Sequence, residues 1–290
     1  MSISSKCSEY HSKDFKWEDL RNEVESNPIY EHHVRPFHSL HQSQDYLPTQ
    51  FNHHPQSRKE DAKAWESFHR RHSSGQFFKE RRYLLNEFPE LSSSESPSIL
   101  LEIGCGSGSS VIPILRANSS ITVYACDCSG EILSKAQQIV EASNISNAKH
   151  RFFPFQCDFP SSSPGIPIKS FDFVTLIFTL SAVPWRRMGE MINECFSVLK
   201  RGGLLLFRDY GLYDMAMLRF EPHKRIGDGE YVRSDGTRAY FFSVETVRDL
   251  FHTAGFVEVE LQFCCVNSVN RKKGQSMARV WVHGKFQKPM

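Results

Sequence analysis

The 290-residue sequence lacks the features that mark membrane and exported proteins. No window approaches the roughly 18 apolar residues that a membrane-spanning helix requires. Residues 1–20 have no apolar centre and hold four acidic side chains, which argues against a signal peptide and against an Arg-rich transit peptide. We therefore expect no membrane partner and a cytoplasmic protein, with the nucleus as a second location.

The sequence also lacks a metal-binding or disulfide pattern. Its eight cysteines include no Cys-x-x-Cys pair with a matching set of cysteines or histidines. Cys105, Cys126 and Cys157 fall at the ends of expected strands, where reduced, buried thiols are common. We expect no metal, and no Ser-His-Asp arrangement points to nucleophilic catalysis.

Charge is nearly balanced overall but unevenly distributed. The formal net charge is +2, yet residues 197–290 hold 15 basic and 10 acidic side chains. Residues 70–82 hold five basic side chains against one acidic side chain. Basic regions on both sides of a nearly neutral segment favour an anionic partner such as RNA, with ordinary solvated charge as the alternative.

The rest of the chain is organised around one strand and the turn that follows it. Residues 99–103 predict a buried strand, and the Gly-x-Gly-x-Gly sequence at 104–108 predicts a tight turn. A second apolar strand, residues 121–126, ends in Asp127. This order is that of a nucleotide-binding βαβ unit, in which glycines let the backbone approach the ligand and the carboxylate binds ribose hydroxyls.

Spacing and two further carboxylates narrow the choice of ligand. The Gly-x-Gly-x-Gly spacing differs from the Gly-x-Gly-x-x-Gly of dinucleotide sites, which disfavours a dehydrogenase. Glu102 stands two positions before the first glycine, where a carboxylate can reach an amino group of the ligand. Asp158 follows a third expected strand, residues 152–156. The alternative is a parallel sheet with a chance glycine turn.

Strand and helix patterns alternate along the rest of the chain, which predicts an α/β fold with a largely parallel sheet. We expect the helix at 185–199 to be stopped by Arg201, Gly202 and Gly203. A final pair of strands is expected at 256–263 and 279–285. The chain divides into a polar, partly disordered extension (1–57), a helical segment (58–96) and the sheet domain (97–290).

Several stretches outside the glycine turn resemble one family. Residues 206–220 (LFRDYGLYDMAMLRF) and 231–242 (YVRSDGTRAYFF) closely resemble the eukaryotic tRNA 3-methylcytidine methyltransferases. So do residues 176–182 and the segment from Trp65 to Leu91. The match covers about residues 60–288, and the seven-stranded, Rossmann-like sheet of a class I methyltransferase, with an antiparallel last strand, is the fold it implies.

The resemblance implies that S-adenosylmethionine (SAM) methylates ring nitrogen 3 of a cytidine in the tRNA anticodon loop. His69 stands where the family usually has tyrosine, Phe159 where it often has leucine, and Thr179 where valine is usual. The cofactor-binding residues that we carry over are Trp65, His69, Glu102, Gly104, Gly106, Gly108, Asp127, Asp158, Phe159 and Ile177.

No strong general base is expected, because the cytosine nitrogen loses no proton when it is methylated. The product base is cationic, so a nearby carboxylate would stabilise it, and Asp209 is the candidate. The alternative for Asp209 is a structural partnership with Arg208 or Arg219. The residues expected to contact tRNA are Arg70, Arg71, Lys79, Arg81, Arg82, Arg208, Tyr210, Arg219, Arg233 and Arg238.

Two other functions stay open at this point. One is a small-molecule or protein methyltransferase on the same fold, and the other is a non-catalytic tRNA-binding scaffold. Family members also differ in whether they depend on a helper protein such as an aminoacyl-tRNA synthetase, so we expect the anticodon stem-loop of tRNA as the partner and such a helper as a second one.

Overall fold

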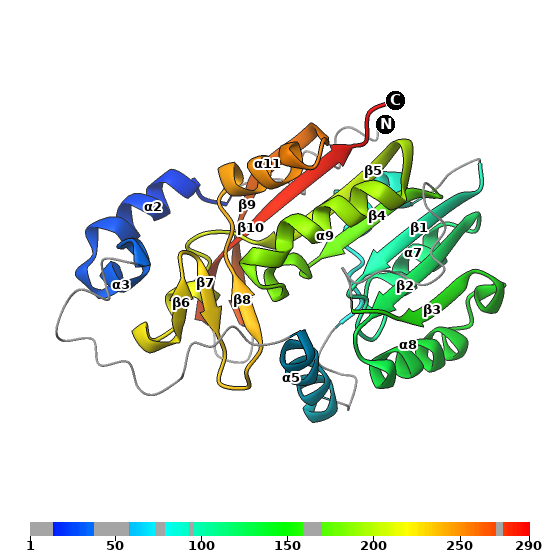
Figure 1. Cartoon of the computed structure of the whole chain (residues 1–290), viewed down its shortest axis with the longest axis horizontal. Helices are drawn as coiled ribbons and strands as arrows, with labels where there is room; N and C mark the ends of the chain where they lie inside the picture. Colours follow the sequence, from blue (N-terminus) through cyan, green and yellow to red (C-terminus); the bar gives the residue numbers. More distant parts are fainter. Residues whose placement is uncertain (1–13, 38–57, 73–78, 93–95, 159–169, 271–274) are drawn as a thin grey trace.

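The computed structural model describes residues 14–37, 58–72, 79–92, 96–158, 170–270 and 275–290 (Figure 1). A seven-stranded sheet forms its centre, with strand order β3-β2-β1-β4-β5-β10-β9. The strands are β1 Ser98–Ile103, β2 Ile121–Asp127, β3 Phe152–Gln156, β4 Phe171–Ile177, β5 Leu199–Tyr210, β9 Val257–Asn270 and β10 Gln275–Gln287.

The last strand in sequence, β10, lies between β5 and β9 and runs antiparallel to both. The other neighbouring pairs, from β3 across to β5, are parallel. The predicted seven-stranded sheet with an antiparallel last strand is therefore confirmed. The carboxyl ends of β1, β2, β4 and β5 meet at one edge, as they do in doubly wound folds.

Helices cover both faces of this sheet. One hydrophobic cluster packs α9 and α11 on one face, and a second packs α6, α7 and α8 on the other. These helices and the one that precedes them are α5 Arg58–Arg71, α6 Leu84–Glu87, α7 Val111–Ala117, α8 Gly130–Ala142, α9 Trp185–Val198 and α11 Val244–Thr253. The 3₁₀ turns along the same part of the chain are η2 Pro89–Leu91, η3 Ala148–His150 and η4 Leu180–Ala182.

Serine side chains cap the N-termini of two of the helices. Ser129 accepts a hydrogen bond from the Ile132 N–H at the start of α8, and Ser243 accepts one from Thr246 at the start of α11. The expected stop of α9 is wrong, because that helix ends at Val198 and the strand β5 already begins at Leu199.

The glycines that were expected to end α9 instead lie inside β5. The β4–β5 register shifts between Phe171 and Phe173, opposite this stretch. A Cβ on Gly203 would lie 3.0 Å from the Lys200 carbonyl oxygen and 3.1 Å from that of Asp172. The close approach of backbone at this irregularity therefore explains the glycine.

A small second sheet, absent from the sequence predictions, stands beside the large one. It consists of β6 Arg225–Gly227, β7 Glu230–Val232 and β8 Arg238–Tyr240, preceded by α10 Met215–Leu218 and η5 Pro222–Lys224. The N-terminal helices α2 Trp17–Ser26 and α3 Glu31–Val34, joined by η1 Pro28–Tyr30, lie next to it (Figure 1).

The N-terminal helices are attached to this second sheet by a core of their own. Val24 of α2 packs in one cluster with Tyr213, Met217, Tyr231 and Phe241. The Tyr213 hydroxyl donates to Glu25 at 2.9 Å, and the Trp17 indole donates to the Leu212 carbonyl at 3.2 Å. Residues 14–37 are thus connected to the segment that follows β5.

The segment at 79–92 belongs to the core of the large sheet. Leu84, Phe88 and Leu91 are fully buried in the cluster that also holds α7 and α8. Because this segment is fixed there, side chains near its start can form part of a site at the sheet edge. No helix among the described residues is long and apolar enough to cross a membrane.

Phe251 tests the packing of α11 on the sheet. Its side chain is fully buried and stacks on Phe286 of β10 with ring centroids 3.9 Å apart. We expect Phe251→Ala to lower the free energy of unfolding by about 3–5 kcal/mol in urea titrations. Phe153→Ala, at an exposed edge position, is the control and should cost far less. Equal losses would contradict this packing.

Candidate active site

A cavity of about 620 Å³ opens at the carboxyl ends of the parallel strands. The glycine turn after β1 and the ends of β2 and β4 form one side, and α5 covers it. Of the predicted cofactor residues, the cavity is lined by Trp65, His69, Gly104, Gly106, Asp127, Asp158 and Ile177. Phe159 lies outside the described residues, and Glu102 and Gly108 do not line the cavity.

The glycine turn depends on the lack of side chains. Gly104 has a φ of +70°, and a Cβ there would lie 2.6 Å from the Thr179 Cγ2 atom. Thr179 is itself fixed, since its hydroxyl donates to the Ile103 carbonyl at 2.9 Å. The backbone therefore approaches the cavity in a conformation that other residues rarely adopt.

Asp127 holds the turn and the next helix in place. One carboxylate oxygen accepts from the Gly106 N–H at 3.0 Å, and the other accepts from the Ser129 N–H at 3.1 Å. The His69 Nε2 atom of α5 lies 4.0 Å from Asp127. Burial lowers the pKa of His69 in spite of the Asp127 charge, which favours a neutral ring beside the carboxylate.

Glu102 lies behind the turn rather than in the cavity. Its side chain is buried, and burial raises its pKa to about 7 although the nearby Ser110 hydroxyl and the charge of Arg81 act in the opposite direction. Its Oε2 atom has no hydrogen-bond partner among the residues described. The carboxyl is therefore divided between its neutral and charged forms near pH 7.

Arg187 is a cavity residue that the sequence patterns did not reveal. It lies in the first turn of α9, only 7% exposed, with Nη2 at 3.8 Å from Asp158. Within the described part of the chain, its Nε and Nη2 atoms have no hydrogen-bond partner. A buried guanidinium requires acceptors, so these donors point to a ligand in the cavity. In the sequence, this arginine is indistinguishable from a solvated helix residue.

Arginines and aromatic rings form the other end of the cavity. We call the residues at this end the wall of the cavity: Arg81, Arg208, Arg233, Arg238 and Arg279, together with Tyr83, Phe178, Tyr210 and Trp281. Three of these arginines are paired with carboxylates: Arg208 with Glu87 at 2.6 Å, Arg238 with Asp61 and Glu230 at 3.2 Å each, and Arg279 with Asp214 at 2.8 Å. Because carboxylates neutralise these three arginines, this end of the cavity can hold an uncharged base as well as an anionic phosphate.

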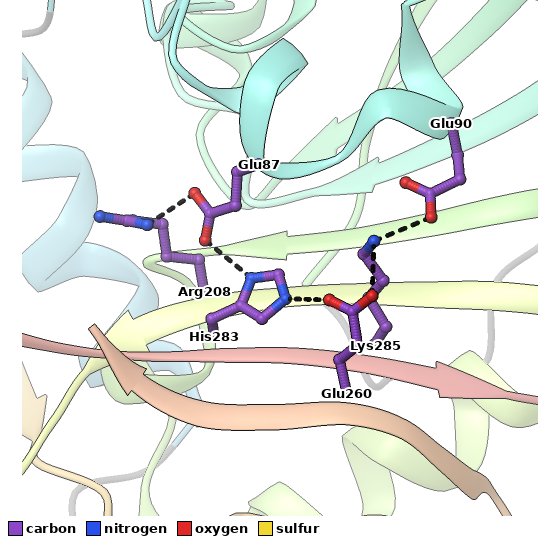
Figure 2. A network of polar contacts seen from close by, with 6 residues as sticks. All are labelled: Glu87, Glu90, Arg208, Glu260, His283 and Lys285. Carbon is purple, nitrogen blue, oxygen red and sulfur yellow. Dashed lines mark hydrogen bonds and ion pairs between the residues drawn. The ribbon is translucent and has the colours of Figure 1, made fainter. Parts of the chain in front are cut away.

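Arg208 is part of the cavity wall rather than of an exposed phosphate-binding surface. It is 2% exposed, and its guanidinium lies over the rings of Tyr83 (4.8 Å) and Trp281 (4.5 Å). Figure 2 shows Glu87 reaching from α6 to this guanidinium. The sequence predicts that Arg208, at the end of its strand, contacts tRNA. Its buried position rules out a solvent-facing contact with a phosphate.

Phe178 has an unusual backbone at the carboxyl end of β4. Its φ is +55°, and its N–H donates to the Arg208 carbonyl at 2.8 Å. Arg81 lies over its ring at 5.1 Å, and the Tyr210 ring is at the same centroid distance. Since bulky residues rarely adopt this conformation, the strain marks a position where the ring's direction matters.

Asp209 is fully buried and does not line the cavity. Its carboxylate accepts from the Ser181 N–H and from the Tyr210 N–H, both at 2.9 Å. Burial raises its pKa to about 6, whereas the two N–H donors favour its charged form. The carboxylate therefore fixes the loop after β4 and contributes negative charge from behind the wall.

Five further residues predicted to bind tRNA lie outside the cavity. Arg70, Arg71, Lys79, Arg82 and Arg219 are exposed. Arg233 and Arg238 are joined at the cavity, since Arg233 donates to the Arg238 carbonyl at 2.7 Å.

The described residues contain no group of three or more His, Cys, Asp or Glu side chains that could hold a metal ion.

The strand order and the site at the carboxyl ends define a class I methyltransferase. Residues 76–261 match the methyltransferase domain family. Two solved structures show the fold alone. One is 1,6-didemethyltoxoflavin-N1-methyltransferase from Burkholderia thailandensis with bound S-adenosylhomocysteine, which has a TM-score of 0.57 and 14% sequence identity over 81% of this chain and 92% of that one. The other is a SAM-dependent methyltransferase from Methanosarcina mazei, with a TM-score of 0.52 and 19% identity over 68% of this chain and 95% of that one.

Two proteins of similar sequence show which methyltransferase family the chain belongs to. The tRNA N(3)-cytidine methyltransferase METTL6 of Rattus norvegicus is 42% identical over 237 residues, which cover 80% of each chain. The tRNA N(3)-methylcytidine methyltransferase Mettl2 of Drosophila melanogaster is 38% identical over 79% of this chain and 71% of that one. The chain belongs to the tRNA N(3)-cytidine methyltransferase family, and the resemblance seen in the sequence is confirmed.

A substitution of Asp127 tests whether the cofactor binds at the glycine-turn end of the cavity. Asp127→Ala removes the acceptor for both the Gly106 and the Ser129 N–H groups, so we expect S-adenosylhomocysteine binding to be lost in calorimetric titrations. Asp172→Ala is the matched control, because Asp172 binds the Ile99 N–H and Lys200 at the opposite end of the sheet. Normal affinity in Asp127→Ala would disprove the assignment.

Proposed function

We propose that this protein transfers a methyl group from SAM to ring nitrogen 3 of a cytidine in the anticodon loop of tRNA. The observation that carries the proposal is a single cavity with two different ends. The glycine turn and Asp127 lie at one end, and an aromatic wall with charge-balanced arginines lies at the other. A methyl donor and its acceptor can therefore meet inside one cavity.

The residues at the first end fit SAM. Positive φ at Gly104 and Gly106 brings the backbone to the cavity, and the Arg187 donors require acceptors that an adenine or a ribose offers. Trp65 and His69 would cover the nucleoside from α5, and Asp127 and Asp158 would face its hydroxyl and amino groups. When bound, SAM supplies the methyl group on a sulfonium, which is a good leaving group.

The second end suits a cytosine. Phe178, Tyr210 and Trp281 place aromatic rings in the lining at this end, and such rings hold unstacked bases in other proteins. Because the ring nitrogen attacks with its own lone pair and loses no proton, the protein has mainly to align the two reactants. Alignment alone can supply about 7–11 kcal/mol. The charged form of Asp209, behind the wall, would stabilise the positive charge of the product.

Exposed arginines near the cavity would hold the tRNA backbone. Arg70, Arg71, Lys79 and Arg82 lie on α5 and the segment that leads to the fold, and the arginines pair with exposed or half-buried acids. We propose that tRNA phosphates replace these acids. We further propose that a helper protein such as an aminoacyl-tRNA synthetase assists the reaction. We also propose that the protein is located in the cytoplasm or the nucleus.

A methylation assay tests the activity. Purified protein, tRNA and SAM carrying an isotopically labelled methyl group are incubated, and the tRNA is digested to nucleosides for mass spectrometry. We expect labelled 3-methylcytidine, and none with Asp127→Ala. Label on proteins or small molecules but never on tRNA would indicate a different methyltransferase. Binding of tRNA without any transfer, with and without cell extract as a source of helper, would indicate a scaffold.

Salt dependence tests the docking surface. Removing charge at Arg70, Arg71, Lys79 and Arg82 by glutamine substitution should weaken tRNA binding. The slope of log K against log salt should become shallower by about 0.7–0.9 for each phosphate that the variant no longer neutralises. Arg248→Gln is the control, since Arg248 pairs with Glu258 away from the cavity. An unchanged slope in the multiple variant would refute the docking role.

A further inference from the structure

A chain of alternating charges leads from the cavity wall to the protein surface (Figure 2). Arg208 donates to Glu87, and the other oxygen of Glu87 lies 3.0 Å from the Nδ1 atom of His283. Beyond His283, the chain continues through Glu260 (3.0 Å) and Lys285 (3.2 Å) to Glu90 (2.9 Å). Three cations thus balance three carboxylates.

His283 donates from both ring nitrogens. Each nitrogen faces a carboxylate oxygen, and an ionised carboxylate can only accept, so both nitrogens carry protons. Burial lowers the pKa of His283, but the hydrogen bonds and charges of Glu260 and Glu87 outweigh it and raise the pKa. The pKa of Glu87 is lowered despite its burial, which places the negative charge on Glu87 rather than a proton.

The charged groups around His283 come from every neighbouring element. Glu87 reaches it from α6, Glu260 from β9, and Arg208 from β5 through Glu87, while Lys285 stands two positions along β10. The ring of Phe88 stacks on the imidazole with centroids 5.1 Å apart. These contacts leave His283 fully buried and fixed in one orientation.

Glu87 needs this imidazole to hold Arg208. Glu87 is fully buried, so a carboxylate oxygen left without a donor would be strongly unfavourable. With donors on opposite sides, its carboxylate cannot turn, and the guanidinium of Arg208 stays over Trp281 and Tyr83 at the cavity.

We infer that Glu87 and His283 are positioning residues for methyl transfer, with the Nδ1–H of His283 fixing Glu87 and Glu87 fixing Arg208 on the wall that receives the base. This inference rests on the proposed function. The outer part of the chain of charges, at Glu260, Lys285 and Glu90, supports the fold rather than the wall.

Two substitutions of His283 separate these roles. The amide nitrogen of asparagine takes the place of Nδ1 and can donate to Glu87, whereas that of glutamine takes the place of Nε2 and reaches Glu260. We expect His283→Asn to keep at least about tenfold more kcat than His283→Gln, whose loss should approach the 10²-fold that a misplaced group costs. The affinity for S-adenosylhomocysteine and for tRNA should change little in both variants.

Glu260→Gln provides a second test that does not depend on a buried substitution. Glu260 is 42% exposed, and its loss breaks only the outer part of the chain of charges. It should therefore reduce kcat less than His283→Gln does. Glu258→Gln, on the same strand and paired with Arg248, is the matched control. Equal activity in His283→Asn and His283→Gln, or an equal loss in Glu260→Gln, would overturn the inference.

A crystallographic readout keeps this inference separate from the proposed function. In structures with S-adenosylhomocysteine, Arg208 should remain over Trp281 in His283→Asn and should move in His283→Gln. If the wild-type protein methylates no cytidine, the proposed function fails, and the position of Arg208 still decides whether His283 acts through Glu87. An unmoved Arg208 in His283→Gln would contradict that coupling.

Discussion

The register between β5 and β10 is the constraint on which the cavity wall depends. His283 pairs with Arg208 in this register, and the neighbouring Trp281 pairs with Tyr210. Because β10 is antiparallel and lies between β5 and β9, side chains from the end of the chain stand beside the carboxyl end of a parallel strand. Glu87, from the segment before the sheet, then completes the wall.

Charge balance explains how an arginine-rich cavity can serve a base that becomes cationic. Glu87, Asp214 and Asp61 each pair with one arginine of the wall, and the first two are fully buried. A neutral cytosine and its positively charged product therefore meet less repulsion than five unpaired arginines would cause. The exposed arginines near α5 remain suited to phosphates, which separates the docking of tRNA from the chemistry on its base.

Sequence patterns predicted the large sheet and the glycine-turn end of the cavity, and the family resemblance pointed to several arginines of the wall but not to the way in which they are paired. The glycine turn and Asp127 could be predicted because local backbone geometry requires them, and alternating periodicities predicted a largely parallel sheet. The seven strands with an antiparallel last strand were implied by the family resemblance alone. The small sheet was missed because each of its strands has three residues. The pairing of Arg208 with Glu87 joins residues 121 positions apart, which no local pattern encodes. Alternation along β10 did offer one signal, since residues 279, 281, 283 and 285 share a face.

The central claim is that this chain forms 3-methylcytidine in the tRNA anticodon loop. The most direct measurement maps this nucleoside, position by position, in tRNA from cells that lack the protein and from the same cells carrying it again. We expect 3-methylcytidine to disappear from the anticodon loop of a subset of tRNAs and to return with the wild-type protein but not with Asp127→Ala. An unchanged map in cells without the protein would contradict it.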